Sequence, residues 1–196
     1  MDFDVIVIGG GPAGLCFARA LGVAEGAASA PLRVAVVETQ TESALAEPAF
    51  DGREIALTHF SARVLRELGL WERFAEGAVS PLRDARVLNG LSLRGMNIEH
   101  RHGNKEELGY LVSNHRIRRA AYEAVRASEH VTLITGVRVE DLRTDGDGGY
   151  VTLADGRTLG ARLIVAADSR FSAARRAMGI PARMHDFGKT MMVCQV

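Results

Sequence analysis

The chain has 196 residues, of which 47% are hydrophobic and 24% are charged, a balance typical of a globular domain with a buried core. Lys and Arg together number 24, as do Asp and Glu, so the net charge is zero, which argues against a dedicated nucleic-acid-binding protein. The two cysteines, Cys16 and Cys194, lie far apart, and no run reaches the ~18 apolar residues of a membrane span. We therefore expect a cytoplasmic protein without a disulfide framework.

The first elements form a strand–helix–strand unit. The apolar run Phe3–Ile8 predicts a buried strand of a parallel sheet. Pro12 stands where a helix would begin, a position that tolerates its missing N–H, and we expect this helix to run to about Val23. A second buried strand is expected at Arg33–Val37, which completes a unit of the usual size.

The middle and the end of the chain predict further helices and a smaller antiparallel layer. Residues 58–74 and Asn114–Ala127 have helical periodicity, and residues 84–90 and 91–100 alternate as strands. Later strands are expected at Val131–Leu133, at Arg138–Leu142, and in a hairpin over residues 144–168 that ends in the buried strand Leu163–Ala167. Residues 186–196 resemble the start of a strand without a partner, so we expect a truncated chain.

A glycine-rich turn follows the first strand. Gly9, Gly11 and Gly14 fit the pattern G-x-G-x-x-G, with Pro12 and Ala13 between the last two glycines. In this pattern the first glycine permits a tight turn, the second lets a pyrophosphate approach the backbone, and the third allows close helix–strand packing. The free N–H groups of the helix N-terminus then attract the anion. The alternative is a glycine-rich turn that binds no ligand.

An acidic residue at the end of the second strand favours a dinucleotide. Glu38 comes 24 residues after Gly14, and a carboxylate there can accept hydrogen bonds from both ribose hydroxyls. The same negative charge disfavours a 2′-phosphate, so FAD or NAD fits this position better than NADP. By contrast, the segment His100–His102 lies in a polar loop without the partners of a metal site, and no metal is predicted.

Four segments together resemble one family. Residues 4–21 resemble the FAD-binding start of aromatic-ring flavin hydroxylases that share the p-hydroxybenzoate hydroxylase fold. Residues 51–74 and 108–125 are similar to the ubiquinone-biosynthesis hydroxylases in particular, and residues 163–180 resemble the second fingerprint of that family. The resemblance implies an α/β fold: a Rossmann-like FAD-binding domain with a parallel sheet, helices and a small antiparallel sheet. It implies an FAD-binding domain over residues 1–185, with an inserted β segment at about 82–112, and the start of a substrate-domain strand at 186–196.

The resemblance also assigns roles to single residues. Gly9, Gly11 and Gly14 match the pyrophosphate turn and Glu38 the ribose-binding acid. Arg53 matches an arginine that reaches the FAD pyrophosphate, a role for which a forked guanidinium is suited; the alternative is a surface ion pair.

A polar residue is expected to open a helix beside the cofactor. Asn114 matches this position, with His115 or Arg116 as alternatives in a shifted register, and the structural alternative for Asn114 is helix capping.

The second fingerprint contains Asp168, Ser172 and Arg175, which the family uses near the flavin and the passing nicotinamide cofactor. The alternative is a purely structural strand–helix turn. Ser169 stands where this fingerprint normally has glycine. A positive φ at that position would strain serine by about 1 kcal/mol and would weaken the expectation for the nicotinamide step.

The resemblance implies an FAD-dependent monooxygenase that hydroxylates an aromatic ring, a ubiquinone-biosynthesis intermediate, using NAD(P)H and O₂. The implied substrate is a small aromatic molecule. A prenylated quinone precursor would imply that the enzyme associates peripherally with the inner membrane or with a multi-enzyme complex. Assembly into a homo-oligomer is a further alternative. No catalytic residue can be named from the sequence. Two alternatives remain: another flavin oxidoreductase of the same fold, and a non-catalytic FAD-binding or assembly module.

Overall fold

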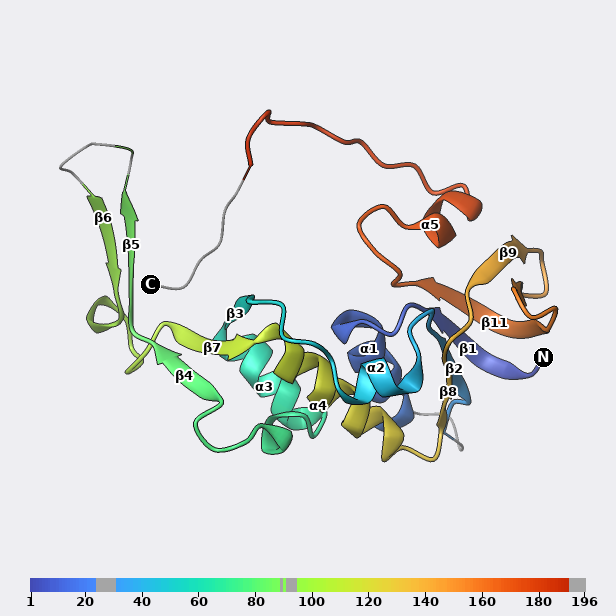
Figure 1. The fold of residues 1–196 in the computed structure, drawn as a ribbon, viewed down its shortest axis with the longest axis horizontal. Coiled ribbons are helices and arrows are strands. Elements are labelled where there is room, and N and C mark those ends of the chain that lie inside the picture. The colour runs from blue at the N-terminus through green and yellow to red at the C-terminus, as the bar shows by residue number, and fades with distance from the viewer. Residues whose placement is uncertain (24–30, 89, 91–94, 191–196) are drawn as a thin grey trace.

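The computed structural model describes residues 1–23, 31–88, 90 and 95–190 (Figure 1). The strands are β1 (Phe3–Ile8), β2 (Val34–Val37), β3 (Glu54–Leu57), β4 (Val79–Leu82), β5 (Asp84–Leu88), β6 (Gly95–Glu99), β7 (Gly109–Ser113), β8 (Val131–Ile134), β9 (Val139–Thr144), β10 (Gly149–Leu153) and β11 (Thr158–Ala166). The helices are α1 (Pro12–Val23), α2 (Glu42–Ala46), α3 (His59–Glu67), α4 (Asn114–Arg126) and α5 (Ala173–Ala177), with 3-10 turns η1 (Trp71–Arg73) and η2 (His100–His102).

The main sheet has the strand order β8-β2-β1-β11-β10-β9. Its first four strands are parallel, whereas β11, β10 and β9 form an antiparallel meander. The central strand β1 is buried from Val5 to Ile8, because both faces of the sheet are covered. The strand–helix–strand unit and the α/β class predicted from the sequence are therefore confirmed.

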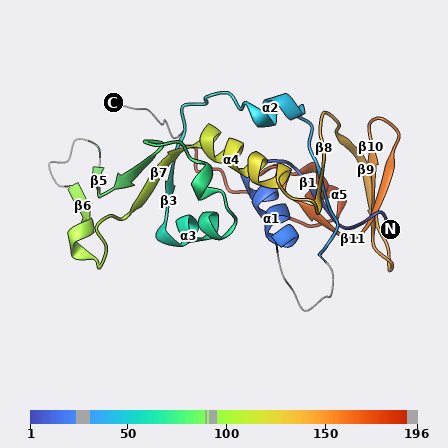
Figure 2. The same ribbon diagram turned by 90° about the horizontal axis from the view of Figure 1, so that it is seen from below.

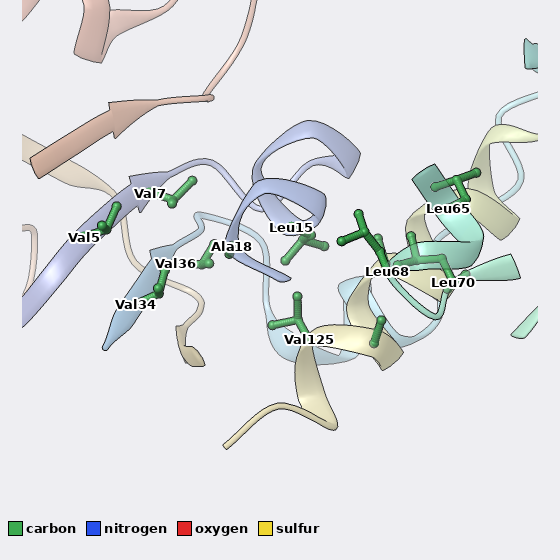
Figure 3. Packing of buried hydrophobic residues seen from close by; sticks show 13 residues of the cluster. Val5, Val7, Leu15, Ala18, Val34, Val36, Leu65, Leu68, Leu70 and Val125 are labelled. Atoms are coloured by element: carbon green, nitrogen blue, oxygen red, sulfur yellow. The ribbon is translucent and has the colours of Figure 1, made fainter. Parts of the chain in front are cut away.

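Helices α1 and α4 pack on one face of the parallel strands, and residues of the meander, which continues the same sheet, and of α5 pack with the residues of the other face. The valines of β1 and β2 that face the helices pack with Leu15 of α1 and Val125 of α4 (Figure 3). The alternate residues, such as Ile6 and Ile8, pack on the other face against Leu142, Val151 and Leu153 of the meander. The apolar runs thus serve two cores, with successive side chains on opposite faces of each strand.

Two smaller sheets lie beyond α4. Strands β3, β7 and β4 form an antiparallel sheet, and β5 pairs with β6 in a separate hairpin. Both views place α4 between the main sheet and the sheet that contains β3 and β7 (Figures 1 and 2). The predicted inserted segment at 82–112 contains the β5–β6 hairpin and most of β7, and the two partners of β7 in its sheet, β3 and β4, lie before it except for Leu82.

One sequence prediction needs correction at its boundary. Periodicity predicts one helix over residues 58–74, but α3 ends at Glu67 and Gly69 takes a φ of +72° before the η1 turn begins. A left-handed glycine after a helix is a common C-terminal cap, and here it lets Leu70 turn back into the core. The strand expected over residues 186–196 lies mostly outside the described ranges, as does Cys194, because residues 191–196 are not described, and it stays a prediction.

Candidate functional site

The three fingerprint glycines meet different surroundings in the turn between β1 and α1. Gly9 has a φ of +112°, and a Cβ atom there would overlap the Ala167 carbonyl oxygen. A Cβ at Gly14 would overlap the Gly9 carbonyl oxygen, whereas a Cβ at Gly11 would meet no atom of the described residues within 4 Å. The first and third glycines are thus required by packing, and the second borders open space. This is the arrangement that a backbone site for phosphate needs.

Helix α1 begins directly at this open space. Pro12 is its first residue, and its first hydrogen bond runs from the Leu15 N–H to the Gly11 carbonyl at 2.9 Å. Ala13 is exposed, while Gly14 is buried against the sheet. The N–H groups of Ala13 and Gly14 belong to the first helical turn, in which backbone donors have no intrahelical partner and can bind an anion.

Glu38 is buried beside the same turn, at the end of β2, with 8% of its surface exposed. Its Oε2 accepts a hydrogen bond from the Gly10 N–H at 2.6 Å. Its Oε1 accepts from the Thr39 hydroxyl at 3.0 Å and from the Gln40 N–H at 2.8 Å. These donors fix the carboxylate and occupy about three of its four acceptor positions. Gly10 and Thr39 were not predicted as part of the site.

A cavity of about 240 Å³ joins these elements at the carboxyl ends of β1, β2 and β11. Ligands in open α/β sheets bind at this edge of the sheet. Its lining combines polar and apolar residues, and it comprises Ile8, Gly9, Gly11, Val37, Glu38, Thr39, Gln40, Val137, Val139, Ala167 and Asp168. Val137 and Val139 belong to the segment that enters the meander, and no motif in the sequence marked them.

The second fingerprint forms a hydrogen-bonded turn after β11. Asp168 accepts hydrogen bonds from the Ser172 hydroxyl and from the Ala174 N–H, the latter at 3.2 Å. Burial raises the pKa of Asp168, but these hydrogen bonds outweigh burial and leave the pKa below its ordinary value. Asp168 is therefore ionised at neutral pH and lines the cavity beside Gly9.

Arg175 and Ser169 of the same fingerprint are not among the residues that line the cavity. The Arg175 guanidinium donates to the Ile180 carbonyl oxygen, and its backbone N–H is capped by the Ser172 hydroxyl at 2.9 Å. The Ser169 hydroxyl accepts from the Phe171 N–H at 3.2 Å. The φ of Ser169 is not positive, so the serine that replaces the usual glycine carries no left-handed strain.

Arg53 and Asn114 meet in a second polar group. Asp51 Oδ2 accepts from Arg53 Nε at 2.8 Å, from Arg53 Nη2 at 2.5 Å and from Asn114 Nδ2 at 2.7 Å. These hydrogen bonds, first from Arg53 and then from Asn114, lower the pKa of Asp51 to about 2. The structure thus brings together two predicted residues that are 61 positions apart, through a carboxylate that the sequence reading missed.

The backbone of Asn114 also contacts this group. Asn114 is 8% exposed, and its backbone N–H donates to the Arg53 carbonyl at 2.8 Å. The adjacent His115 instead packs edge to face on Phe50, with 5.3 Å between ring centroids. Arg116 is exposed. Among the three residues considered for this position, Asn114 is the one that contacts the Asp51–Arg53 turn.

Comparison with known proteins decides the family. The sequence pattern of a family described as an FAD-binding domain matches residues 2–196. The chain belongs to this FAD-binding domain family. FAD is therefore the cofactor class of the domain, and the residues present fit it: an open Gly11, a free helix N-terminus and a buried acid at the end of β2.

Relatives of this FAD-binding domain agree with the resemblance seen in the sequence. It is 45% identical to the ubiquinone hydroxylase UbiM of Neisseria meningitidis over 98% of this chain and 41% of that protein. It is 34% identical to the ubiquinone hydroxylase UbiL of Rhodospirillum rubrum over 98% of this chain and 43% of that protein. The chain thus spans less than half the length of these relatives.

A solved structure supports the fold. The FAD-binding domain superposes on PqsL, described as a probable FAD-dependent monooxygenase from Pseudomonas aeruginosa, with a TM-score of 0.70. The match covers 94% of this chain and 48% of that chain at 24% identity, and so shows the shared fold. Within the described ranges, none of the helices is long and apolar enough to cross a bilayer, and no cluster of metal-binding side chains is found.

Proposed function

We propose that this domain binds FAD within a monooxygenase that hydroxylates the aromatic ring of a ubiquinone precursor, with NAD(P)H and O₂ as co-substrates. The observation that carries the proposal is the 45% identity to a ubiquinone hydroxylase over nearly the whole chain, together with a glycine turn whose open position is Gly11. Bound FAD supplies the redox chemistry of such an enzyme, and the protein supplies binding, orientation and charge.

The adenosine half of FAD would be held by the glycine turn and Glu38. The N–H groups at the start of α1 would bind the pyrophosphate, and Val37, Val137 and Val139 offer apolar surface for the adenine. Because Glu38 already accepts three hydrogen bonds, holding both ribose hydroxyls requires one donor to leave. The Thr39 hydroxyl can rotate away, whereas the Gly10 and Gln40 donors are fixed backbone groups.

Arg53 and Asp168 have the remaining proposed roles. The exposed Arg53 guanidinium would offset the charge of the pyrophosphate, since forked N–H donors suit phosphate oxygens. Ionised Asp168 lies at the end of β11 beside Gly9, where it can accept a hydrogen bond from a hydroxyl group of the cofactor. A role of Asp168 and Arg175 near the nicotinamide cofactor stays a prediction.

The proposed substrate class also bears on where the enzyme works in the cell and on what it associates with. A polyprenylated substrate would require the enzyme to work from the cytoplasm at the surface of the inner membrane. Association with other enzymes of the same route, or with a second copy, is a prediction of the same kind. The competing proposals are a flavin oxidoreductase with another substrate and a non-catalytic FAD-binding module.

Anaerobic flavin reduction tests the proposed function. The full-length protein encoded by the gene is mixed with NADH or NADPH, with and without candidate prenylated phenols, and the flavin absorbance is followed. We expect one ring compound to accelerate reduction and to be hydroxylated once O₂ is admitted. Reduction that no ring compound accelerates would favour the oxidoreductase alternative, and absence of reduction would favour the non-catalytic module.

A further inference from the structure

The sequence Asp-Gly-Arg forms the same turn twice in this chain. In both copies the glycine takes a positive φ, +70° at Gly52 and +87° at Gly156. In the first copy, Arg53 Nε and Nη2 lie 2.8 and 2.5 Å from Asp51 Oδ2. In the second copy, Asp155 Oδ2 lies 2.8 Å from Nε and 2.7 Å from Nη2 of the arginine at position 157. The turn is thus a self-contained clamp for an arginine.

The two copies differ in what else they hold. Asp51 also accepts from Asn114 Nδ2 at 2.7 Å, and the Arg53 carbonyl accepts from the Asn114 N–H at 2.8 Å. Asp155 has its described partners within its own turn. Only the first copy therefore connects its arginine to the N-terminus of a long helix, α4. The connection is buried on the Asn114 side and open on the Arg53 side, where 62% of the side chain is exposed.

We propose that Asp51 is a positioning residue for FAD: its carboxylate fixes the Arg53 guanidinium and the Asn114 amide as one preformed site for the phosphate and hydroxyl groups of the cofactor. This inference rests on the proposed FAD function. Asp51 engages Nε and Nη2 of Arg53, so the Nη1 edge is left to meet an anion. Because Asn114 donates through Nδ2, its amide oxygen is left to accept from a hydroxyl.

Preorganisation and charge make opposite predictions for the loss of Asp51. A long, exposed arginine loses conformational freedom when it binds phosphate, and a clamp that orders it beforehand strengthens binding. The same carboxylate also carries a negative charge beside Arg53, the residue proposed to bind phosphate, and this charge would weaken binding. The carboxylate lies within hydrogen-bond distance of two groups that the family pattern assigns to FAD, which favours preorganisation as the dominant effect.

FAD titration of the full-length apoprotein, followed by flavin fluorescence, tests the proposal. We expect Asp51→Ala to weaken FAD binding about tenfold, the size of one charge-assisted hydrogen bond. Asp51→Asn keeps one acceptor, and we expect it to recover part of the loss. The matched control is Asp155→Ala, which removes the same clamp from the second turn and should leave the FAD dissociation constant within about twofold.

A double-mutant cycle separates positioning from a general loss of structure. If Asp51 acts through Arg53, then Asp51→Ala should add little to the effect of Arg53→Ala on FAD binding. In the apoprotein, nuclear magnetic resonance of the arginine Nε–H groups gives a readout that needs no FAD. Asp51→Ala should speed hydrogen exchange at Arg53, and Asp155→Ala should speed it only at the arginine of the second turn.

The outcomes distinguish the two proposals. Wild-type protein that binds no FAD would overturn the proposed function and this inference together. Wild-type protein that binds FAD, with equal or tighter binding by Asp51→Ala, would overturn the positioning role alone. Additive effects of the Asp51 and Arg53 substitutions would also overturn it, because the aspartate would then act independently of the arginine.

Discussion

Gly11 and Gly14 belong to one fingerprint, yet their surroundings assign them different physical roles. A Cβ at Gly14 would overlap the Gly9 carbonyl oxygen, so Gly14→Ala must displace backbone. We expect it to lower the free energy of unfolding by about 1–3 kcal/mol, the usual cost of overpacking. A Cβ at Gly11 would have no atom within 4 Å in the part of the chain that the structure describes, so Gly11→Ala should change the unfolding free energy of the apoprotein by less than ~0.5 kcal/mol.

The same pair of variants separates folding from binding. Because Gly11 borders the open space where a pyrophosphate would approach, we expect Gly11→Ala to weaken FAD binding at least about tenfold. Urea unfolding of the apoproteins and FAD titration of the folded proteins measure the two effects separately. A Gly11→Ala protein that binds FAD as tightly as wild type would place the phosphate elsewhere. An unchanged unfolding midpoint for Gly14→Ala would contradict the packing argument.

At the scale of elements, the sequence predicts best where the apolar pattern and the local chemistry agree. Strand β1 and helices α1 and α4 have clear patterns, and their observed bounds lie within a residue of the predicted ones. The predicted helix over residues 58–74 is wrong after Glu67, because Leu68 and Trp71 continue the apolar period while Gly69 turns the chain. Periodicity reports which side chains are buried and does not report the backbone conformation between them.

In the candidate site, too, residues that depend on contacts distant in the sequence were not predicted. The glycine turn and Glu38 were predictable, since their chemistry follows a fixed spacing along one strand–helix–strand unit. Asp51 was not, because its role depends on Asn114, 63 positions away, which only the pairing of β3 with β7 brings to it. The available signal was the Asp-Gly-Arg sequence, a turn in which a short acidic side chain faces the arginine two positions later.

The hydrogen bonds that link Asp51 to Arg53 and to α4 also predict that the free energy of unfolding depends on pH. Hydrogen bonds from Arg53 and Asn114 lower the pKa of Asp51 from its ordinary 3.8 to about 2 in the folded protein. The ionised carboxylate therefore stabilises the fold above pH 4, and this contribution is lost as the pH falls from about 4 toward 2. Salt should reduce it, because Arg53 is largely exposed.

Denaturant unfolding between pH 5 and pH 2.5 measures this contribution. We expect the stability of Asp51→Asn to fall less steeply with acidification than that of the wild type, with the difference shrinking in high salt. Equal slopes for the two proteins would show that the carboxylate gains nothing from Arg53 and Asn114 in the folded state.

At the scale of the whole molecule, the two faces of the main sheet serve different purposes. The helix face holds the larger core, which continues through α4 toward α3 and η1 (Figure 3). The residues of the opposite face form a second core with the meander β9–β11 and α5, and the segment that enters the meander brings Val137 and Val139 to the cavity beside Glu38. Packing in this second core therefore shapes the proposed adenosine site. Packing in the helix-side core stabilises the fold but lies farther from that site.

Leu153→Ala and Leu70→Ala test this division. Both leucines have 0% exposure, Leu153 in strand β10 of the meander and Leu70 in the helix-side core, so each substitution should lower the free energy of unfolding by about 2–5 kcal/mol. Leu153 pairs in the sheet with Val139, which lines the cavity, so we expect Leu153→Ala to weaken FAD binding several-fold as well. Leu70→Ala should leave the affinity of the folded protein within about twofold. Calorimetry at a temperature where both variants are folded gives the affinities. Equal losses of affinity in the two variants would mean that FAD responds to overall stability, and that the meander does not shape its site.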